Sequence, residues 1–381
     1  MSSAAVIGIG MIPFGKHPDR SIVDMGAEAA FLALKDAGIK PAQVDACFFA
    51  SGFAARLFGD MTVGQHVFWE LGINRVPMVN VENACTSGST AFYLACNMVN
   101  AGQADIVLVA GAEKLYVPEL GLINSGETEL ETQLGLVASA GFALRAIRHM
   151  NEFGTTPQQL AQVAVKNRRH GNLNPFAQFR EPITVEEVLN SPIIVEPFTR
   201  LQCCPNADGA AAAVVCSTSM AKKLSRAVNV EAAILCTGSY ENPQDLTHWE
   251  TDYRACRLAY EKAGIGPKDL DVVECHDAFT ISEILHYEAL GLCRKGEGGK
   301  LVEKGETALG GRIPVNVSGG LLSRGHPVGA TGVAQIIEIV TQLRNEAGAR
   351  QVEGAKVGLA HCMGGDKAAD TKSCTIVVLS V

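Results

Sequence analysis

FLALKDAGIKPAQVDACFFAS, from Phe31 to Ser51, is the stretch that decides the fold, because the chain repeats it later as CRLAYEKAGIGPKDLDVVECH, from Cys256 to His276. The triplet Ala-Gly-Ile, a following proline and an aspartate recur in register in both copies. In the first copy the apolar run at 44–50 predicts a strand that follows a helix. The repeat therefore predicts an α/β protein made of two similar halves, with sheets covered by helices.

An apolar run with the core VNV lies downstream of each copy and leads into a reactive residue. MVNV (Met78–Val81) leads into Cys85 within NACTSGS, and PVNV (Pro314–Val317) leads into His326 within GGLLSRGHPVGATG. A thiol at a helix N-terminus is favoured as thiolate, and a neutral imidazole beside it can accept its proton. Since the same fold unit delivers both, we expect Cys85 and His326 to face each other across an approximate two-fold axis. The alternatives are a core cysteine at a tight turn and a structural histidine.

A second cysteine, Cys362, lies in AHCMGGD directly after the predicted strand VGLAH. Gly364 and Gly365 permit close backbone approach and leave amides that can hold an oxyanion. An ordinary junction between a strand and a turn is the alternative. His276 lies in ECHDAF, where it could pair with Asp277 as a metal ligand. Because nothing else in the sequence completes such a site, we predict that no metal is bound.

The composition is that of a globular chain, with 381 residues of which 47% are hydrophobic and 19% charged. A formal net charge of −8 and the lack of an extended basic stripe argue against nucleic acid as a partner. The apolar runs fall far short of the roughly 20 residues of a membrane span, and MSSAAVIGIG lacks the basic region of a signal peptide. The twelve scattered cysteines suit a reducing compartment. We therefore expect a cytoplasmic protein.

The pattern changes between the two halves and predicts an insert. Residues 117–192 are predicted as an inserted loop domain, between an N-terminal half at 1–116 and 193–247 and a C-terminal half at 248–381. The insert carries the densest basic cluster of the chain, which consists of Arg145, Arg148, Lys166, Arg168, Arg169 and His170. An acidic chain that binds an anionic ligand needs such a local cluster. A solvated helix face is the alternative.

Taken together, the motifs resemble those of the thiolase family over essentially the whole chain. NACTSGS resembles its nucleophile motif, GGLLSRGHPVGATG its GHP motif and HCMGG its C-x-G motif. ECHDAF and MNEFGTTPQQLAQVAVKNRRHGNLNPFAQ resemble the sterol-carrier-protein-X type of thiolase. Many members of that type have a cysteine where this chain has Ala278, whereas Cys362 is placed as in common thiolases. The resemblance implies a five-layer α-β-α-β-α fold.

The resemblance also implies roles for the candidate residues. Cys85 is expected to be the acylated nucleophile, His326 its activating base and Cys362 the second acid/base. His276 and His326 are expected to form one oxyanion hole, and the amides of Cys85 and Gly364 the other. The implied reaction is thiolysis of a 3-oxoacyl-CoA by coenzyme A, or the reverse Claisen condensation, with no tightly bound cofactor. The basic cluster of the insert is then the candidate site for the phosphates of coenzyme A.

The resemblance implies at least a homodimer, and we expect the strand IVLVAGAEK (Ile106–Lys114) to supply an edge that pairs across the two-fold interface. Several similar chains work with a small zinc-ribbon plus OB-fold protein, as in benzoylsuccinyl-CoA thiolase. The rival functions are a condensing enzyme, such as a ketoacyl or hydroxymethylglutaryl-CoA synthase, and an aldolase or scaffold relative that acts with a small partner. Condensing synthases lack a second acid/base cysteine in a C-x-G loop, so Cys362 favours a thiolase.

Overall fold

A nine-stranded sheet organises the computed structural model, which describes residues 4–117, 128–222, 226–239, 245–367 and 370–381. Five strands come from the first part of the chain: β1 (Ala4–Met11), β2 (Ala46–Ala50), β3 (Met78–Val81), β4 (Ile106–Glu113) and β7 (Gly209–Ser217). Four follow: β8 (Val228–Cys236), β9 (Val272–Glu274), β10 (Val357–Lys367) and β11 (Asp370–Ser380). The order is β3-β2-β4-β7-β1-β8-β11-β10-β9. The pairs of β2 with β3 and β4, and of β9 with β10, are parallel, whereas the central pairs are antiparallel.

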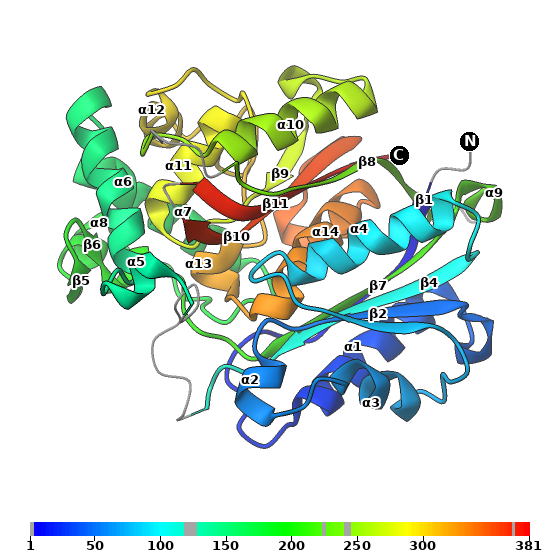
Figure 1. The fold of residues 1–381 in the computed structure, drawn as a ribbon. Coiled ribbons are helices and arrows are strands. Elements are labelled where there is room, and N and C mark those ends of the chain that lie inside the picture. Colours follow the sequence, from blue (N-terminus) through cyan, green and yellow to red (C-terminus); the bar gives the residue numbers. More distant parts are fainter. Residues whose placement is uncertain (1–3, 118–127, 223–225, 240–244, 368–369) are drawn as a thin grey trace.

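The helices form layers that cover the outer faces of this sheet and lie between the two halves of the molecule. Those of the first half are α1 (Ile22–Ala37), α2 (Ala54–Phe58), α3 (Val63–Glu70), α4 (Ser87–Asn100) and α9 (Thr218–Ala221). Those of the second half are α10 (Glu250–Ala263), α11 (Thr280–Ala289), α12 (Gly298–Glu303), α13 (Gly320–Arg324) and α14 (Val328–Leu343). In Figure 1, α1 and α3 cover the outer face of the first half, α4 and α14 lie between the halves, and α10 and α11 cover the outer face of the second. The five-layer prediction is confirmed.

Each helical layer has its own apolar core. Met25 and Phe68 are fully buried under α1 and α3, Phe92 and Ile336 between the halves, and Trp249 under α10. The outer helices bury one face each, whereas α14 in the middle layer is buried on nearly every side.

The segment between β4 and β7 packs beside the second half (Figure 1). It contains α5 (Leu130–Gln133), α6 (Ala138–Phe153), α7 (Pro157–Asn172), α8 (Val185–Leu189) and the small hairpin β5 (Ile193–Val195) and β6 (Phe198–Thr199). Thr156 caps α7 by accepting a hydrogen bond from the amide of Gln159, and Pro157 takes the first helical position, where no amide is needed.

The duplication extends to individual hydrogen bonds. Asp45 accepts hydrogen bonds from the amides of Asp105 and Ile106 and so holds the start of β4 against β2. Asp271 accepts from the amides of Lys356 and Val357 and holds the start of β10 against β9 in the same way. The recurring aspartate of the repeat is thus a shared connection between neighbouring parallel strands.

Three expectations about strands need correction. Ile106–Glu113 is no edge strand, because β4 pairs with both β2 and β7 and the sheet ends at β3. Strand β8, which the predicted boundary at 247 assigns to the N-terminal half, pairs with β11 over most of its length and with β1 at only two positions. Cys362 lies inside β10 and not after its end, since pairing with β11 continues to Lys367.

Within the described residues, no helix combines the length and the apolar character that crossing a membrane requires.

Candidate active site

Cys85 lies at the turn between β3 and α4. Ala84 takes a left-handed backbone conformation (φ 48°), which turns the chain sharply before the helix. The hydroxyl of Thr86 donates to the carbonyl of Asn83 at 2.7 Å, and that of Ser87 donates to the carbonyl of Ala84 at 2.6 Å. The small polar residues of NACTSGS therefore fold this turn and leave the Cys85 thiol partly exposed at the helix N-terminus.

His326 meets Cys85 from the second half, as predicted. Its Nε2 lies 3.3 Å from the Cys85 sulfur, and its Nδ1 lies 2.7 Å from the hydroxyl of Thr331. That hydroxyl donates its one hydrogen to the carbonyl of Pro327 at 2.9 Å, so it accepts from Nδ1. Nε2 of the neutral ring therefore carries a lone pair directed at the thiol, as a general base requires.

Burial keeps this pair neutral at rest. It raises the pKa of Cys85 to about 12, an effect to which Glu113 adds and which a backbone hydrogen bond from Gly365 opposes. Burial, followed by the charge of Arg324, lowers the pKa of His326 to about 3. A thiol and an imidazole in contact are thus poised to exchange a proton once a substrate carbonyl is present to accept the thiolate's attack.

Cys362 and His276 form a second pair beside the first. The Cys362 sulfur lies 3.4 Å from Nδ1 of His276 and 3.1 Å from the carbonyl oxygen of Cys85. The rings of His276 and His326 are 5.1 Å apart and nearly perpendicular. Burial, and after it the nearby Cys85, raises the pKa of Cys362 well above its usual range, and burial lowers that of His276. The structure thus brings all four predicted side chains together.

Gly364 lies against the start of α4. A Cβ atom added there would be 3.0 Å from the amide nitrogens of both Cys85 and Thr86. The Thr86 amide donates to Asn83, whereas the described residues provide no hydrogen-bond acceptor for the Cys85 amide. A side chain here would force these atoms to shift, whereas glycine allows the approach without strain and leaves an amide donor beside the Cys85 sulfur.

Two clusters of the described residues are compact enough to hold a metal: Cys85 with His276 and His326, and Asp252 with His286 and His361. The pair of His276 and Asp277 considered from the sequence is not one of them. The Asp277 carboxylate instead accepts from the amides of Leu321 and Leu322 at 2.7 and 3.3 Å. That no metal is bound stays a prediction.

Two residues of the basic cluster are not placed to bind phosphate. Arg145 is fully buried, stacks over Trp249 with its guanidinium 4.3 Å from the ring centre, and pairs with Asp366 at 3.3 Å. Lys166 is buried and pairs with Glu283 at 2.7 Å. Their charges are compensated inside the protein, so the expectation for these two residues needs correction.

Of the remaining members, His170 is buried and accepts a hydrogen bond from the amide of Leu309, whereas the three arginines lie nearer to solvent. Arg148 has a 59% exposed side chain and pairs with Glu152 at 2.7 Å, and Arg169 is exposed. Arg168 is partly buried, and its guanidinium lies 4.3 Å from the ring centre of Phe179. The basic cluster predicted from the sequence therefore does not form a single surface patch.

The sequence analysis missed residues that support the site. Thr331 sets the histidine tautomer, and Glu113 lies buried near Cys85, where its carboxylate accepts from the amides of Gly52 and Gly329. A glutamate at the end of an apolar strand was a possible signal for Glu113. The position of Thr331 five residues after His326 carried no signal, because only the helical turn brings the two together.

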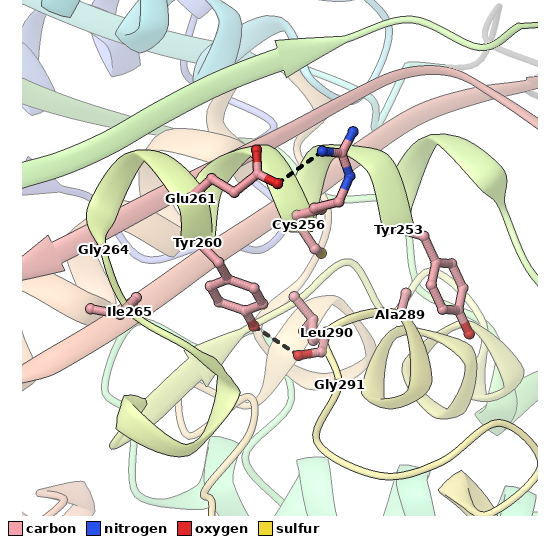
Figure 2. A pocket seen from close by; sticks show the side chains of 10 residues that line it. Tyr253, Cys256, Tyr260, Glu261, Gly264, Ile265, Ala289, Leu290 and Gly291 are labelled. Atoms are coloured by element: carbon pink, nitrogen blue, oxygen red, sulfur yellow. Dashed lines mark hydrogen bonds and ion pairs between the residues drawn. The ribbon is translucent and has the colours of Figure 1, made fainter.

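A pocket of about 470 Å³ lies apart from these residues, between α10 and the end of α11. Figure 2 shows its lining, which includes the ion pair of Arg257 with Glu261 and the hydroxyl of Tyr260, which donates to the carbonyl of Leu290 at 2.7 Å. None of the four catalytic candidates lines it.

A thiol paired with a histidine from the other half of a duplicated five-layer fold, with a second thiol in reach, defines an acyltransferase of the thiolase class. Family models agree: the thiolase N-terminal domain matches residues 4–219, and the thiolase C-terminal domain-like model matches residues 233–378. The chain belongs to the thiolase family, and the predicted family and enzyme class are confirmed.

Named relatives resemble the chain over nearly its full length. It is 41% identical to the acetyl-CoA acetyltransferase of Methanothermobacter thermautotrophicus, over 96% of this chain and 97% of that protein. It is also 41% identical to the benzoylsuccinyl-CoA thiolase subunit BbsB of Thauera aromatica, over 94% of both chains. Human sterol carrier protein 2 is 40% identical over 94% of this chain and 69% of its own length.

Solved structures share the fold. An aldolase described as Ltp2-ChsH2(DUF35) superposes with a TM-score of 0.84 at 27% identity, over 98% of this chain and 97% of that one. Human mitochondrial 3-ketoacyl-CoA thiolase in complex with CoA superposes with a TM-score of 0.75 at 18% identity, over 100% of this chain and 98% of that one.

Proposed function

We propose that the enzyme cleaves a 3-oxoacyl-CoA with coenzyme A, and catalyses the reverse condensation, through an acyl group on Cys85. The observation that carries this proposal is the pairing of two thiols with two histidines: Cys85 with His326 at 3.3 Å and Cys362 with His276 at 3.4 Å. Carbon–carbon cleavage needs one group to hold the acyl chain and another to protonate the departing carbon, and the site offers both.

The first half-reaction forms the acyl-enzyme. His326 takes the proton of Cys85 at Nε2, and the thiolate adds to the 3-oxo carbon of the substrate. The bond between C2 and C3 then breaks, and its electron pair goes to the enolate of the leaving acyl-CoA. Cys362 protonates that carbon, which leaves an acyl thioester on Cys85, a protonated His326 and a Cys362 thiolate.

The second half-reaction restores the site. The Cys362 thiolate takes the thiol proton of coenzyme A, whose sulfur attacks the acyl carbon. The bond to Cys85 breaks, and the released thiolate recovers its proton from His326. Every proton removed in the first half-reaction is thus returned in the second.

The oxyanions of these steps need donors. We assign the amides of Cys85 and Gly364 to the oxygen of the acyl group, supported by the close approach of Gly364 to the Cys85 amide. We assign His276 and His326 to the enolate oxygen, supported by their neighbouring rings. Loss of one such donor typically costs about 3 kcal/mol in the transition state.

Acylation of Cys85 tests the proposal. After incubation with an acyl-CoA, tryptic mass spectrometry should place the acyl mass on Cys85, and Cys85→Ser should lose thiolysis by about four orders of magnitude because a hydroxyl is far less acidic than a thiol. Cys293→Ser, at a partly exposed cysteine that lines a separate pocket together with Tyr253 and Glu288, is the matched control and should retain activity. Label only on Cys203, Cys204 or Cys362 would contradict the assignment.

We assign the phosphates of coenzyme A to Arg148 and Arg168, the two predicted phosphate ligands that are not buried. Arg148→Gln and Arg168→Gln should each raise the KM for coenzyme A about three- to tenfold and leave kcat unchanged, because a surface ion pair contributes roughly 1 kcal/mol. Arg257→Gln, in an exposed pair with Glu261 on α10, is the control. Unchanged KM values in both variants would place the phosphates elsewhere.

A homodimer is proposed through β3, which ends the sheet formed by the described residues and pairs there with β2 alone. Val79 on this strand and Trp69 on the adjacent α3 are exposed apolar residues, 45% and 55% accessible, and a second copy would cover them. Light scattering at micromolar concentration should give twice the chain mass of 40.2 kDa. A monodisperse monomer would contradict this.

A small zinc-ribbon plus OB-fold partner is proposed from the likeness to an aldolase whose description includes a DUF35 component. Co-expression with a small protein encoded next to this chain should yield a complex that survives gel filtration, and separate elution would contradict the partner.

We also propose a cytoplasmic location, supported by twelve free cysteines.

A further inference from the structure

A buried cluster of three ionisable side chains lies behind the catalytic residues and has no part in the steps above. Asp252 on α10 faces His286 on α11, with Oδ2 and Nδ1 2.8 Å apart. It also faces His361 on β10, with Oδ1 and Nε2 3.4 Å apart. All three residues are at most 1% exposed, so they meet neither solvent nor substrate. Any effect of these three residues on the reaction must therefore be exerted through another residue.

That residue is His276. Its backbone N–H donates to Nδ1 of His361 at 3.4 Å, and its carbonyl oxygen accepts from Nε2 of His286 at 3.1 Å. Strand β9 has ended at Glu274, so two imidazoles replace the strand partners that would otherwise hold this peptide. The loop that carries His276 is thus clamped on both sides by the cluster.

The contacts fix the proton positions on His361. Because Nδ1 accepts a hydrogen bond from an amide, the hydrogen of the neutral ring is on Nε2, where it faces Asp252. A metal between the three residues is incompatible with this arrangement. A neutral histidine bound to a metal through Nε2 carries its hydrogen on Nδ1, which would then meet the amide hydrogen of His276.

The contacts of His286 require one additional proton. Its Nε2 must donate, because the carbonyl of His276 can only accept, and its Nδ1 lies against a carboxylate oxygen. A neutral ring would direct a lone pair at that oxygen. Burial lowers the pKa of His286, and the contact with Asp252 opposes this effect.

We propose that Asp252, His286 and His361 are positioning residues that fix the His276 ring between Cys362 and His326, and that Asp252 and His286 share one proton to do so. The inference rests on the proposed role of His276 in the reaction. The ring of His276 is the element that touches both catalytic pairs, 3.4 Å from the Cys362 sulfur and 5.1 Å from the His326 ring. A displacement of its peptide by about 1 Å would lower the rate about 100-fold.

Asp252→Asn tests the positioning, because it keeps the shape of the side chain and removes the charge that holds the shared proton. Solvent deuterium incorporation at the α-carbon of acetyl-CoA, which needs Cys362 and His276, should fall about 10- to 100-fold. Acylation of Cys85, which needs His326, should stay within about threefold. Glu338→Gln, in a buried pair with Arg350, is the matched control and should change neither rate. Equal losses in both rates, or no loss, would overturn the proposal.

A neutron structure of the wild-type enzyme tests the proton independently of any variant and decides the matter if Asp252→Asn does not fold. We expect a deuteron between Asp252 Oδ2 and His286 Nδ1, and none on Nδ1 of His361. An empty position between the carboxylate and His286 would overturn the shared proton. A wild-type enzyme that fails to acylate Cys85 would instead contradict the proposed function, so the two failures are distinguishable.

Discussion

The two halves of the molecule carry the same strands and end them differently. In the first half, Ala50 of β2 pairs with Gly111 of β4. In the aligned repeats His276 occupies the position equivalent to Ala50. The register of β9 with β10 matches that of β2 with β4, so Cys362 is equivalent to Gly111. A Cβ atom on Gly111 would lie 2.1 Å from the carbonyl oxygen of Gly329, so the first half has small residues where α14 begins. The second half has its catalytic side chains at the same positions.

The same contrast appears at the two helix starts. Glu113 at the end of β4 accepts a hydrogen bond from the amide of Gly329 in the first turn of α14, at 3.0 Å. The equivalent residue of β10 is Gly364, which places no side chain at the start of α4 beside Cys85. A helix N-terminus is a site for negative charge. The first half satisfies it with a buried carboxylate, and the second leaves it for an oxyanion of the reaction.

Among the variants that test this contrast between the halves, removal of the second thiol should have the largest effect. Cys362→Ala makes the second half resemble the first at this register, and deuterium exchange at the α-carbon of acetyl-CoA should fall about 1,000-fold because the acid/base is lost. Acylation of Cys85 from a simple acyl-CoA should continue. Mass spectrometry and exchange on the same sample separate the two steps.

His276→Ala provides the counter-test. If His276 is the acid/base in place of a cysteine at Ala278, His276→Ala abolishes exchange and Cys362→Ala changes it little. We expect the larger loss for Cys362→Ala, because Cys362 shares its strand with Gly364, and a loss of about 100-fold for His276→Ala, because it removes one donor to the enolate oxygen. Cys293→Ala is the control for loss of a cysteine outside the site.

Closing the open helix N-terminus should have the next largest effect. Gly364→Ala places a methyl group 3.0 Å from the Cys85 amide, and the rate of acylation should fall about 100- to 1,000-fold because that donor is obstructed. Gly141→Ala is the matched control, since its methyl group would meet nothing closer than 3.6 Å. Rapid-quench measurement of acylation decides, and an unchanged rate would remove Gly364 from the oxyanion hole.

Sequence patterns could predict the duplication and the meeting of Cys85 with His326, because both follow from a repeat read in register. They could not predict that β4 is internal, since a buried strand has the same apolar composition whether it has one partner or two. The reach of β10 past Cys362 was hidden by Gly364 and Gly365, which suggest a turn in a sequence and form part of a strand here.

The basic cluster shows a different limit. Arg145 and Lys166 have the charge that a phosphate needs, but their buried partners come from residues more than 100 positions away, Asp366 and Glu283. Charge can be read from a sequence, whereas compensation of that charge depends on tertiary contacts. The same holds for Asp252, His286 and His361, which come together only in the folded chain.

Removal of the buried Glu113 carboxylate should change how the free energy of unfolding depends on pH. Burial raises the pKa of Glu113 from 4.5 to about 7, so the folded protein keeps this proton when the unfolded chain has lost it. Stability therefore falls as the pH rises from 4.5 to 7, by about 3 kcal/mol from this group. Glu113→Gln does not titrate, and its stability relative to the wild type should rise by that amount between pH 4.5 and pH 8. Denaturant unfolding at both pH values measures this, and a difference that does not vary with pH would contradict the assignment.

The smallest expected effect tests whether the halves are equivalent where their sequences agree. Asp45 and Asp271 each accept hydrogen bonds from two amides at the start of a neighbouring strand. Asp45→Ala and Asp271→Ala should therefore each lower the free energy of unfolding by about 1 kcal/mol, since both carboxylates are at least partly open to water. The two sites share no partner, so the double variant should show the sum to within about 0.5 kcal/mol. A much larger loss at Asp271 would mean that the second half tolerates less strain because its strands end in the catalytic residues. Equal losses would show that the halves differ only where the chemistry requires it, at the strand ends and not at the strand starts.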